Sequence, residues 1–105
     1  MDNFEKLLAI VNGLTKKFPD GNEPFQIITR LCEESGELAK EVNHFEKTGI
    51  KIQKYGQPDP QDLANEVQHV IRSALAIAQY YNVGDYLDKS IDATFQKLTV
   101  DGFIN

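Results

Sequence analysis

The chain has 105 residues, of which 41% are hydrophobic, 10% aromatic and 26% charged. This composition is typical of a globular protein, argues against a disordered or low-complexity chain, and predicts a single domain over residues 1–105. The net charge of −5 argues against a surface that binds nucleic-acid polymers. No apolar run approaches the roughly 18 residues that cross a bilayer, so we expect no membrane contact. A single cysteine and an acidic N-terminus without signal-peptide features favour a cytoplasmic protein.

Apolar residues recur at helical spacing in four segments, which are separated by turns at 19–22, 56–60 and 82–85. The spacing predicts three helices over about residues 2–17, 24–47 and 60–81, and a shorter one that starts at Asp85 and extends to about Leu98. Residues 50–55 are short and lysine-rich, and are expected to form a loop. The prediction is therefore an all-α fold of four helices.

The two central helices are expected to pack against each other in antiparallel orientation, because residues 48–59 form a linker of sufficient length. The first and last helices are expected to cover part of this pair. A chain of this length leaves little material to cover the rest, so we expect a homodimer or a higher homo-oligomer to complete the bundle. Cys32 lies among apolar residues and is expected to be a buried structural thiol.

Each central helix carries an acidic stripe beside its apolar face. The stripes consist of Glu34, Glu37 and Glu41 on one helix and of Asp62, Glu66 and His69 on the other. Both stripes lie on the same rotational side of the apolar seam, so an antiparallel pair brings them into one groove. Converging carboxylates repel one another, and a divalent cation such as Mg²⁺ or Mn²⁺ relieves that repulsion. The alternative interpretation is a solvated acidic surface.

Two segments carry a resemblance to a known family. Residues 31–41 read LCEESGELAKE and residues 63–71 read LANEVQHVI. Together they resemble the MazG-like nucleotide pyrophosphohydrolases of the all-α NTP pyrophosphatase superfamily, over about residues 25–80. The family pattern is Glu-x-x-Glu on one helix and Glu-x-x-Asp on the next. Glu34 and Glu37 match its first half and Glu66 begins the second, but His69 stands where the family has aspartate.

The resemblance implies hydrolysis of a nucleoside triphosphate between its α and β phosphates, with Mg²⁺ as cofactor and a dimer or tetramer as the working form. Glu34, Glu37 and Glu66 would hold the metal, with His69 at the fourth position. Glu33 or Glu37 would orient or deprotonate the attacking water.

Cationic side chains are also needed to hold the substrate's phosphates. The candidates are Lys54, in the expected loop, and Arg72, one turn beyond His69.

His69 leaves several alternatives open. Its imidazole favours Mn²⁺ or another transition metal over Mg²⁺, or it marks a catalytically weak or inactive relative that serves as a nucleotide-binding or interaction module. Glu41-x-x-His44 and Glu66-x-x-His69 also match the paired Glu-x-x-His motifs of di-iron carboxylate bundles. Such bundles need a glutamate from each of two further helices, and the first and last predicted helices do not offer one at a suitable position.

Overall fold

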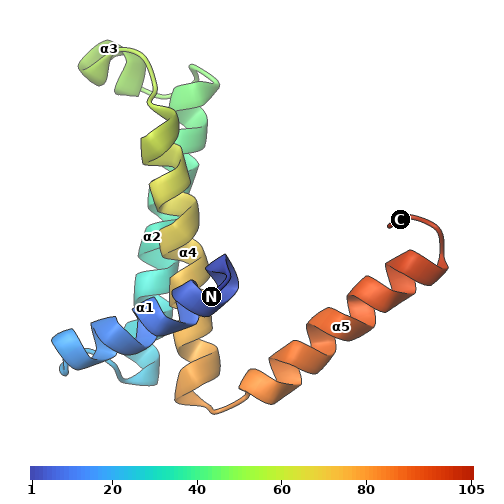
Figure 1. The fold of residues 1–105 in the computed structure, drawn as a ribbon. Helices are drawn as coiled ribbons and strands as arrows, with labels where there is room; N and C mark the ends of the chain where they lie inside the picture. Colours follow the sequence, from blue (N-terminus) through green and yellow to red (C-terminus); the bar gives the residue numbers. More distant parts are fainter.

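The computed structural model describes all residues 1–105 and consists entirely of helices joined by turns (Figure 1). The helices are α1 (Asn3–Lys17), α2 (Pro24–Phe45), α3 (Lys51–Tyr55), α4 (Pro60–Tyr80) and α5 (Gly84–Val100). The all-α prediction and its four long helices are confirmed. The segment predicted as a loop contains the five-residue helix α3, which apolar periodicity cannot reveal because it is little more than one turn long.

Local sequence determines where the long helices begin. The Asp2 side chain accepts a hydrogen bond of 2.8 Å from the Glu5 backbone N–H at the start of α1. Asp59 accepts one of 2.9 Å from the Gln61 N–H at the start of α4. Pro24 and Pro60 each occupy the first turn of a helix, where the proline's lack of an N–H costs nothing. The start signals of these helices are therefore encoded within four residues of each boundary.

The centre of the molecule is the antiparallel pair of α2 and α4, which lie side by side over most of their length (Figure 1). Two contacts define their register: Tyr80 donates to Glu23 at one end, and His69 lies against Glu34 further along. α1 crosses the pair and packs against α4, where Gln79 Nε2 donates to the Leu8 carbonyl oxygen at 3.3 Å. The antiparallel prediction, on which the shared groove depends, is thus confirmed.

Few side chains are buried within this single chain. The buried apolar residues are Val11, Ile27 and Leu75, where α1, α2 and α4 meet. Cys32 is exposed, contrary to expectation, and so are Phe25 and Ile28 on the same helix. The prediction for Cys32 was wrong because apolar spacing identifies a face of α2 but not whether another element of the chain covers it.

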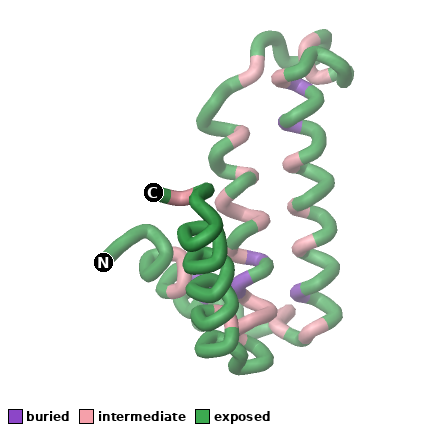
Figure 2. The backbone as a smooth tube through the Cα atoms, turned by 90° about the vertical axis from the view of Figure 1, so that its right-hand side faces the viewer, coloured by how far each residue is buried: buried purple, intermediate pink, exposed green.

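α5 projects away from the central pair instead of covering it, and it contacts the rest of the molecule through α4 alone (Figures 1 and 2). Its apolar side chains are therefore exposed; Phe95 is 58% and Tyr86 72% accessible. The projecting direction follows the turn at Asn82, whose φ of 55° lies in the left-handed region. No helix of the molecule has the length and apolar character needed to cross a membrane.

Candidate metal centre

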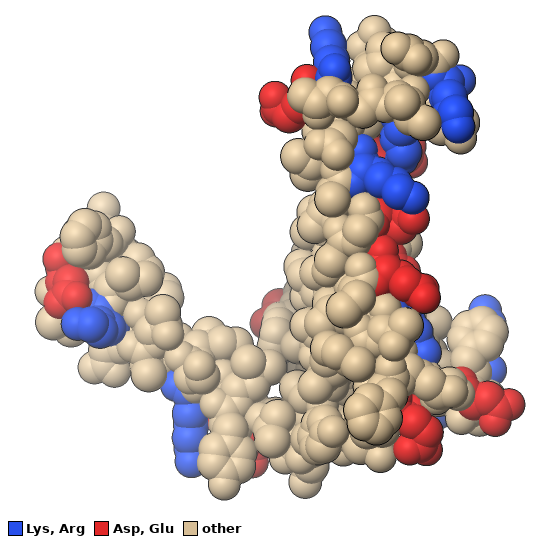
Figure 3. All heavy atoms as spheres, turned by 180° about the vertical axis from the view of Figure 1, so that it is seen from behind, with Lys and Arg blue, Asp and Glu red and all other residues tan.

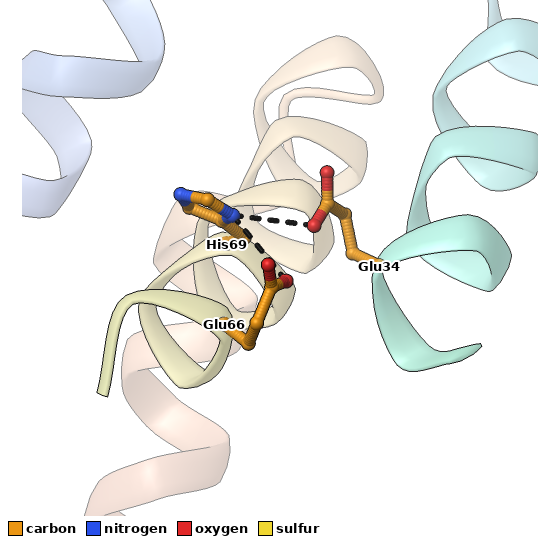
Figure 4. Close-up of side chains that lie close together, drawn as sticks. All are labelled: Glu34, Glu66 and His69. Atoms are coloured by element: carbon orange, nitrogen blue, oxygen red, sulfur yellow. Dashed lines mark hydrogen bonds and ion pairs between the residues drawn. The ribbon is translucent and has the colours of Figure 1, made fainter. Parts of the chain in front are cut away.

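Three of the predicted ligands converge where α2 and α4 face each other (Figure 4). Glu34 extends from α2, and Glu66 and His69 extend from successive turns of α4. His69 Nδ1 lies 3.3 Å from Glu34 Oε2 and 3.4 Å from Glu66 Oε2. One ligand atom from each residue lies within 4.8 Å of the other two. We call these three residues the Glu34–Glu66–His69 cluster.

The electrostatics of the cluster centre on Glu66. Burial, the hydrogen-bonding interaction with Glu34 and the negative charge of Glu34 raise the pKa of Glu66, while His69 opposes that rise. Glu66 Oε2 is shielded from solvent and accepts no hydrogen bond. A carboxylate oxygen in this state is destabilised and gains from a cation placed between the two helices.

The residues of the cluster suit a divalent metal ion. Two carboxylates and one imidazole nitrogen form a mixed oxygen–nitrogen donor set, and Glu66 Oε2, which lies 3.4 Å from His69 Nδ1 but accepts no hydrogen bond, supplies a ligand atom. Mg²⁺ prefers oxygen donors, whereas Mn²⁺ and other transition metals also accept imidazole. The donor set therefore fits Mn²⁺ better than Mg²⁺.

Glu33 and Glu37, the predicted catalytic residues, lie outside this cluster. Glu37 is half exposed and its Oε1 lies 3.3 Å from Lys40 Nζ, one turn along the same helix. Glu33 is exposed and lines a shallow depression with Phe25 and Arg30. The structure thus brings together Glu34, Glu66 and His69 from the predicted set, and leaves Glu33 and Glu37 outside the cluster.

A lysine lies at the end of the two acidic stripes that is nearest to α3. Lys51, at the start of α3, forms an ion pair with the buried Glu41. The hydrogen bond with Glu41 raises the pKa of Lys51, burial opposes this rise, and the charges of Glu41, Glu37 and Asp62 add to it. Lys54, the predicted phosphate contact, is exposed instead. Both lysines belong to α3, and the packing of α3 against α2 determines which of them pairs with Glu41.

His44 contacts the chain just beyond the C-terminal end of α3. It is buried, and its Nε2 lies 2.7 Å from the carbonyl oxygen of Gly56, whose φ of 79° requires glycine. Glu41 and His44 are thus committed to holding α3 against α2. This pair was half of the di-iron alternative, and it lies apart from the Glu34–Glu66–His69 cluster.

Acidic side chains follow one edge of the central pair, and basic side chains lie beside them toward α3 (Figure 3). The region of the two predicted stripes therefore has two parts. Its outer part is balanced by Lys51 next to Glu41, whereas its inner part, the Glu34–Glu66–His69 cluster, contains no lysine or arginine.

A cavity of about 510 Å³ adjoins the cluster. It lies between α1, α2 and α4, because α1 packs on α4 and leaves a space beside α2. Glu34 belongs to both the cluster and the cavity wall, and Arg30 and Arg72 line the same cavity. Arg72 is the predicted phosphate contact and donates to Gln68 at 2.9 Å. Arg30 was missed because only the tertiary arrangement places it next to Arg72.

Comparison of the chain with protein families, characterised proteins and solved structures gives no match.

Proposed function

We propose that this protein is a metal-dependent nucleotide pyrophosphohydrolase, which hydrolyses a nucleoside triphosphate between its α and β phosphates to release a nucleoside monophosphate and pyrophosphate. The observation that supports this most strongly is the position of Glu34, which belongs to the Glu34–Glu66–His69 cluster and also lines a cavity that contains two arginines. The resemblance of residues 31–41 and 63–71 to the MazG-like enzymes points to the same activity.

Each charged group of the site has a part in this proposal. Glu34, Glu66 and His69 would hold Mn²⁺ or Mg²⁺, which offsets phosphate charge and increases the acidity of a water. Arg72 and Arg30 would hold phosphate oxygens, a task that the planar guanidinium performs well. Glu37, one turn beyond Glu34 on α2, would orient the attacking water.

The size of the cavity agrees with a small-molecule substrate. Its 510 Å³ falls within the range of about 300–1,000 Å³ found for ligand pockets. The cavity is enclosed on three sides by helices of the same chain, and polar and apolar residues both contribute to its wall. Such a site suits a free nucleotide, and the single cysteine fits a cytoplasmic protein.

The test is a pyrophosphate-release assay over ribo- and deoxynucleoside triphosphates, with Mg²⁺ and Mn²⁺ in parallel. We expect Glu66→Gln and Glu34→Gln to lower the rate on the order of 100-fold or more, since each removes a metal ligand. Glu46→Gln is the matched control, because Glu46 is exposed just beyond the end of α2 and should leave the rate unchanged. If Glu66→Gln releases pyrophosphate as fast as the wild type, the assigned site is wrong.

A second candidate function is nucleotide binding without turnover, and His69 is the observation that favours it. Its imidazole contacts both Glu34 and Glu66, at the position where the family pattern has an aspartate. Nucleotide binding by the wild type, with pyrophosphate release only after His69→Asp, would support this second function.

We also propose that the working form is a homodimer. The chain exposes 7934 Å², whereas a compact 11.9 kDa monomer exposes roughly 6,000 Å². The excess of about 2,000 Å² matches the area that each partner buries in a large, permanent interface. Exposed apolar side chains on α5 and on the outer face of α2, among them Phe95, Ile91 and Phe25, would supply it. Light scattering should give a mass of twice 11.9 kDa.

A further inference from the structure

The α2–α4 pair carries an uncharged surface that no other helix of the chain covers. Exposed residues without charge recur every three or four positions on both helices, which is the spacing of one helix face. The larger ones are 41–46% accessible. We call this set the apolar strip; it consists of Ile28, Cys32, Ser35, Ala39 and Val42 on α2, and of Val67, Ile71 and Ala74 on α4.

Both halves of the apolar strip lie on the same side of the pair. Around each helix, they are offset by about 80–160° in one sense from the glutamate of the cluster, Glu34 on α2 and Glu66 on α4. These two glutamates approach each other between antiparallel helices, so equal offsets in one sense place both halves on one side. Figure 3 agrees, since the surface beside the acidic edge of the pair carries few charged side chains.

α5 leaves the pair on the side away from the acidic edge, at an open angle to the strip of its own chain (Figures 1 and 3). The turn before α5 holds it in this direction. The Val83 N–H donates to the Ala78 carbonyl oxygen at 3.0 Å and the Asn82 N–H to the Gln79 carbonyl oxygen at 3.1 Å, while Asn82 has a φ of 55°. These two bonds and a left-handed residue form a Schellman motif, which ends a helix with a defined change of direction.

The exposed side of α5 matches the apolar strip in character and in length. Ile91, Phe95 and Leu98 recur at helical spacing and are 48%, 58% and 39% accessible. The 17 residues of α5 span about 25 Å, and the strip on α2 spans about 21 Å from Ile28 to Val42. Covering both surfaces accounts for the roughly 2,000 Å² by which this chain exceeds a compact monomer.

We propose that α5 of one copy packs along the apolar strip of a second copy, and that the exchange is reciprocal. A two-fold axis then lets each α5 enter the open angle between α5 and the central pair of the other copy, so both strips are covered by one kind of contact. This inference rests on the homodimer proposed above and specifies which surfaces meet in it. It leaves the acidic edge, on the other side of the pair, uncovered.

Cysteine cross-linking tests the exchange directly. Cys32 is the only cysteine of the chain and lies within the apolar strip, so a second cysteine on α5 reports whether the two surfaces meet. Four single variants sample successive turns of the apolar side of α5: Leu87→Cys, Ile91→Cys, Phe95→Cys and Leu98→Cys. Gln96→Cys is the matched control, because Gln96 is exposed on the far side of the same helix.

Each variant is first checked for unchanged helicity by circular dichroism and is then oxidised. Its mass is measured without reductant, and the linked peptides are identified after trypsin digestion. For at least one variant on the apolar side, we expect residues 31–40 to be joined to the peptide that carries the new cysteine, in a species of twice 11.9 kDa. Gln96→Cys should not form this link.

The outcomes separate the exchange from the homodimer itself. The same link in a species of 11.9 kDa would show that α5 folds back onto its own chain, which would overturn the exchange. A dimer by light scattering in which none of the four variants links to Cys32 would also overturn the exchange and leave the homodimer intact. A monomer by light scattering would overturn both, while the pyrophosphate-release assay tests the enzymatic proposal independently.

Discussion

Replacing Glu66 by glutamine should stabilise the protein when no metal is bound, although it removes a residue of the proposed site. The side chain of Glu66 is only 20% accessible to solvent, and its Oε2 accepts no hydrogen bond. Burial and the neighbouring Glu34 raise the pKa of Glu66, which means that its carboxylate is less stable in the folded protein than in the unfolded chain.

The direction of the pH dependence follows from that rise. The folded protein holds the Glu66 proton more tightly than the unfolded chain does, so ionisation of Glu66 lowers the free energy of unfolding once the pH exceeds the ordinary value of 4.5. The loss grows until the pH passes the folded-state pKa and is constant above it. Each pH unit between the unfolded-state and the folded-state pKa lowers the free energy of unfolding by about 1.4 kcal/mol. Glutamine carries no charge at any pH, so it avoids this loss.

We therefore expect Glu66→Gln to raise the free energy of unfolding by about 1 kcal/mol at pH 7, because its amide can donate to Glu34 where the carboxylate repelled it. In a domain of this size that gain corresponds to a melting temperature about 4–8 °C higher. The difference from the wild type should disappear near pH 4.5. Glu37→Gln is the control, since Glu37 is half exposed, and it should change stability by less than about 0.5 kcal/mol.

Thermal unfolding followed by circular dichroism, at one protein concentration and with a metal chelator, measures these values. Adding Mn²⁺ at about 100 times its dissociation constant should then stabilise the wild type by about 2.7 kcal/mol and Glu66→Gln far less. A lower melting temperature for metal-free Glu66→Gln would refute the electrostatic argument. Equal stabilisation of both proteins by Mn²⁺ would show that the ion binds elsewhere.

Three further predictions concern other parts of the molecule. His69→Asp should shift the metal preference from Mn²⁺ toward Mg²⁺, measured as the ratio of pyrophosphate-release rates with the two ions. Lys51→Met should lower the free energy of unfolding in urea by about 2–3 kcal/mol because Glu41 stays buried without its partner, whereas Lys54→Met should change it by less than about 0.5 kcal/mol. Because the pKa of Lys51 is raised, the stabilisation that its ion pair with Glu41 provides should persist up to pH 10.5 and be lost as the pH rises further. Phe95→Asp should convert the proposed dimer into monomers in sedimentation velocity, and an unchanged dimer would exclude α5 from the interface.

Most of the fold is encoded locally. The starts of α2 and α4 follow from a proline in the first turn, and the apolar periodicity of these two helices extends over more than about five turns. The same periodicity placed both acidic stripes on one side of the seam, and the antiparallel packing then brought Glu34 opposite His69. These properties depend on residues near one another in the chain, so they can be derived from it directly.

Which of the acidic residues form the Glu34–Glu66–His69 cluster could not be derived from local spacing. Glu34 and Glu37 lie on the same stripe of α2, yet only Glu34 reaches the Glu66 and His69 side chains. Spacing along a helix gives the direction of a side chain to within a broad sector, whereas ligand geometry requires contact to within a few ångströms. The rotation and separation of α2 and α4, which their packing sets, determined which carboxylate enters the cluster.

The amino-acid sequence was therefore sufficient to specify the helices, their amphipathic faces and the set of charged residues from which a site is drawn, since each of these depends on local spacing. Tertiary contacts alone determined that Lys51 rather than Lys54 faces the acidic groove, that Arg30 joins Arg72 in one cavity, and that α5 projects from the central pair. All three depend on how elements distant in the chain approach one another, and the periodicity of a single helix carries no information about that approach.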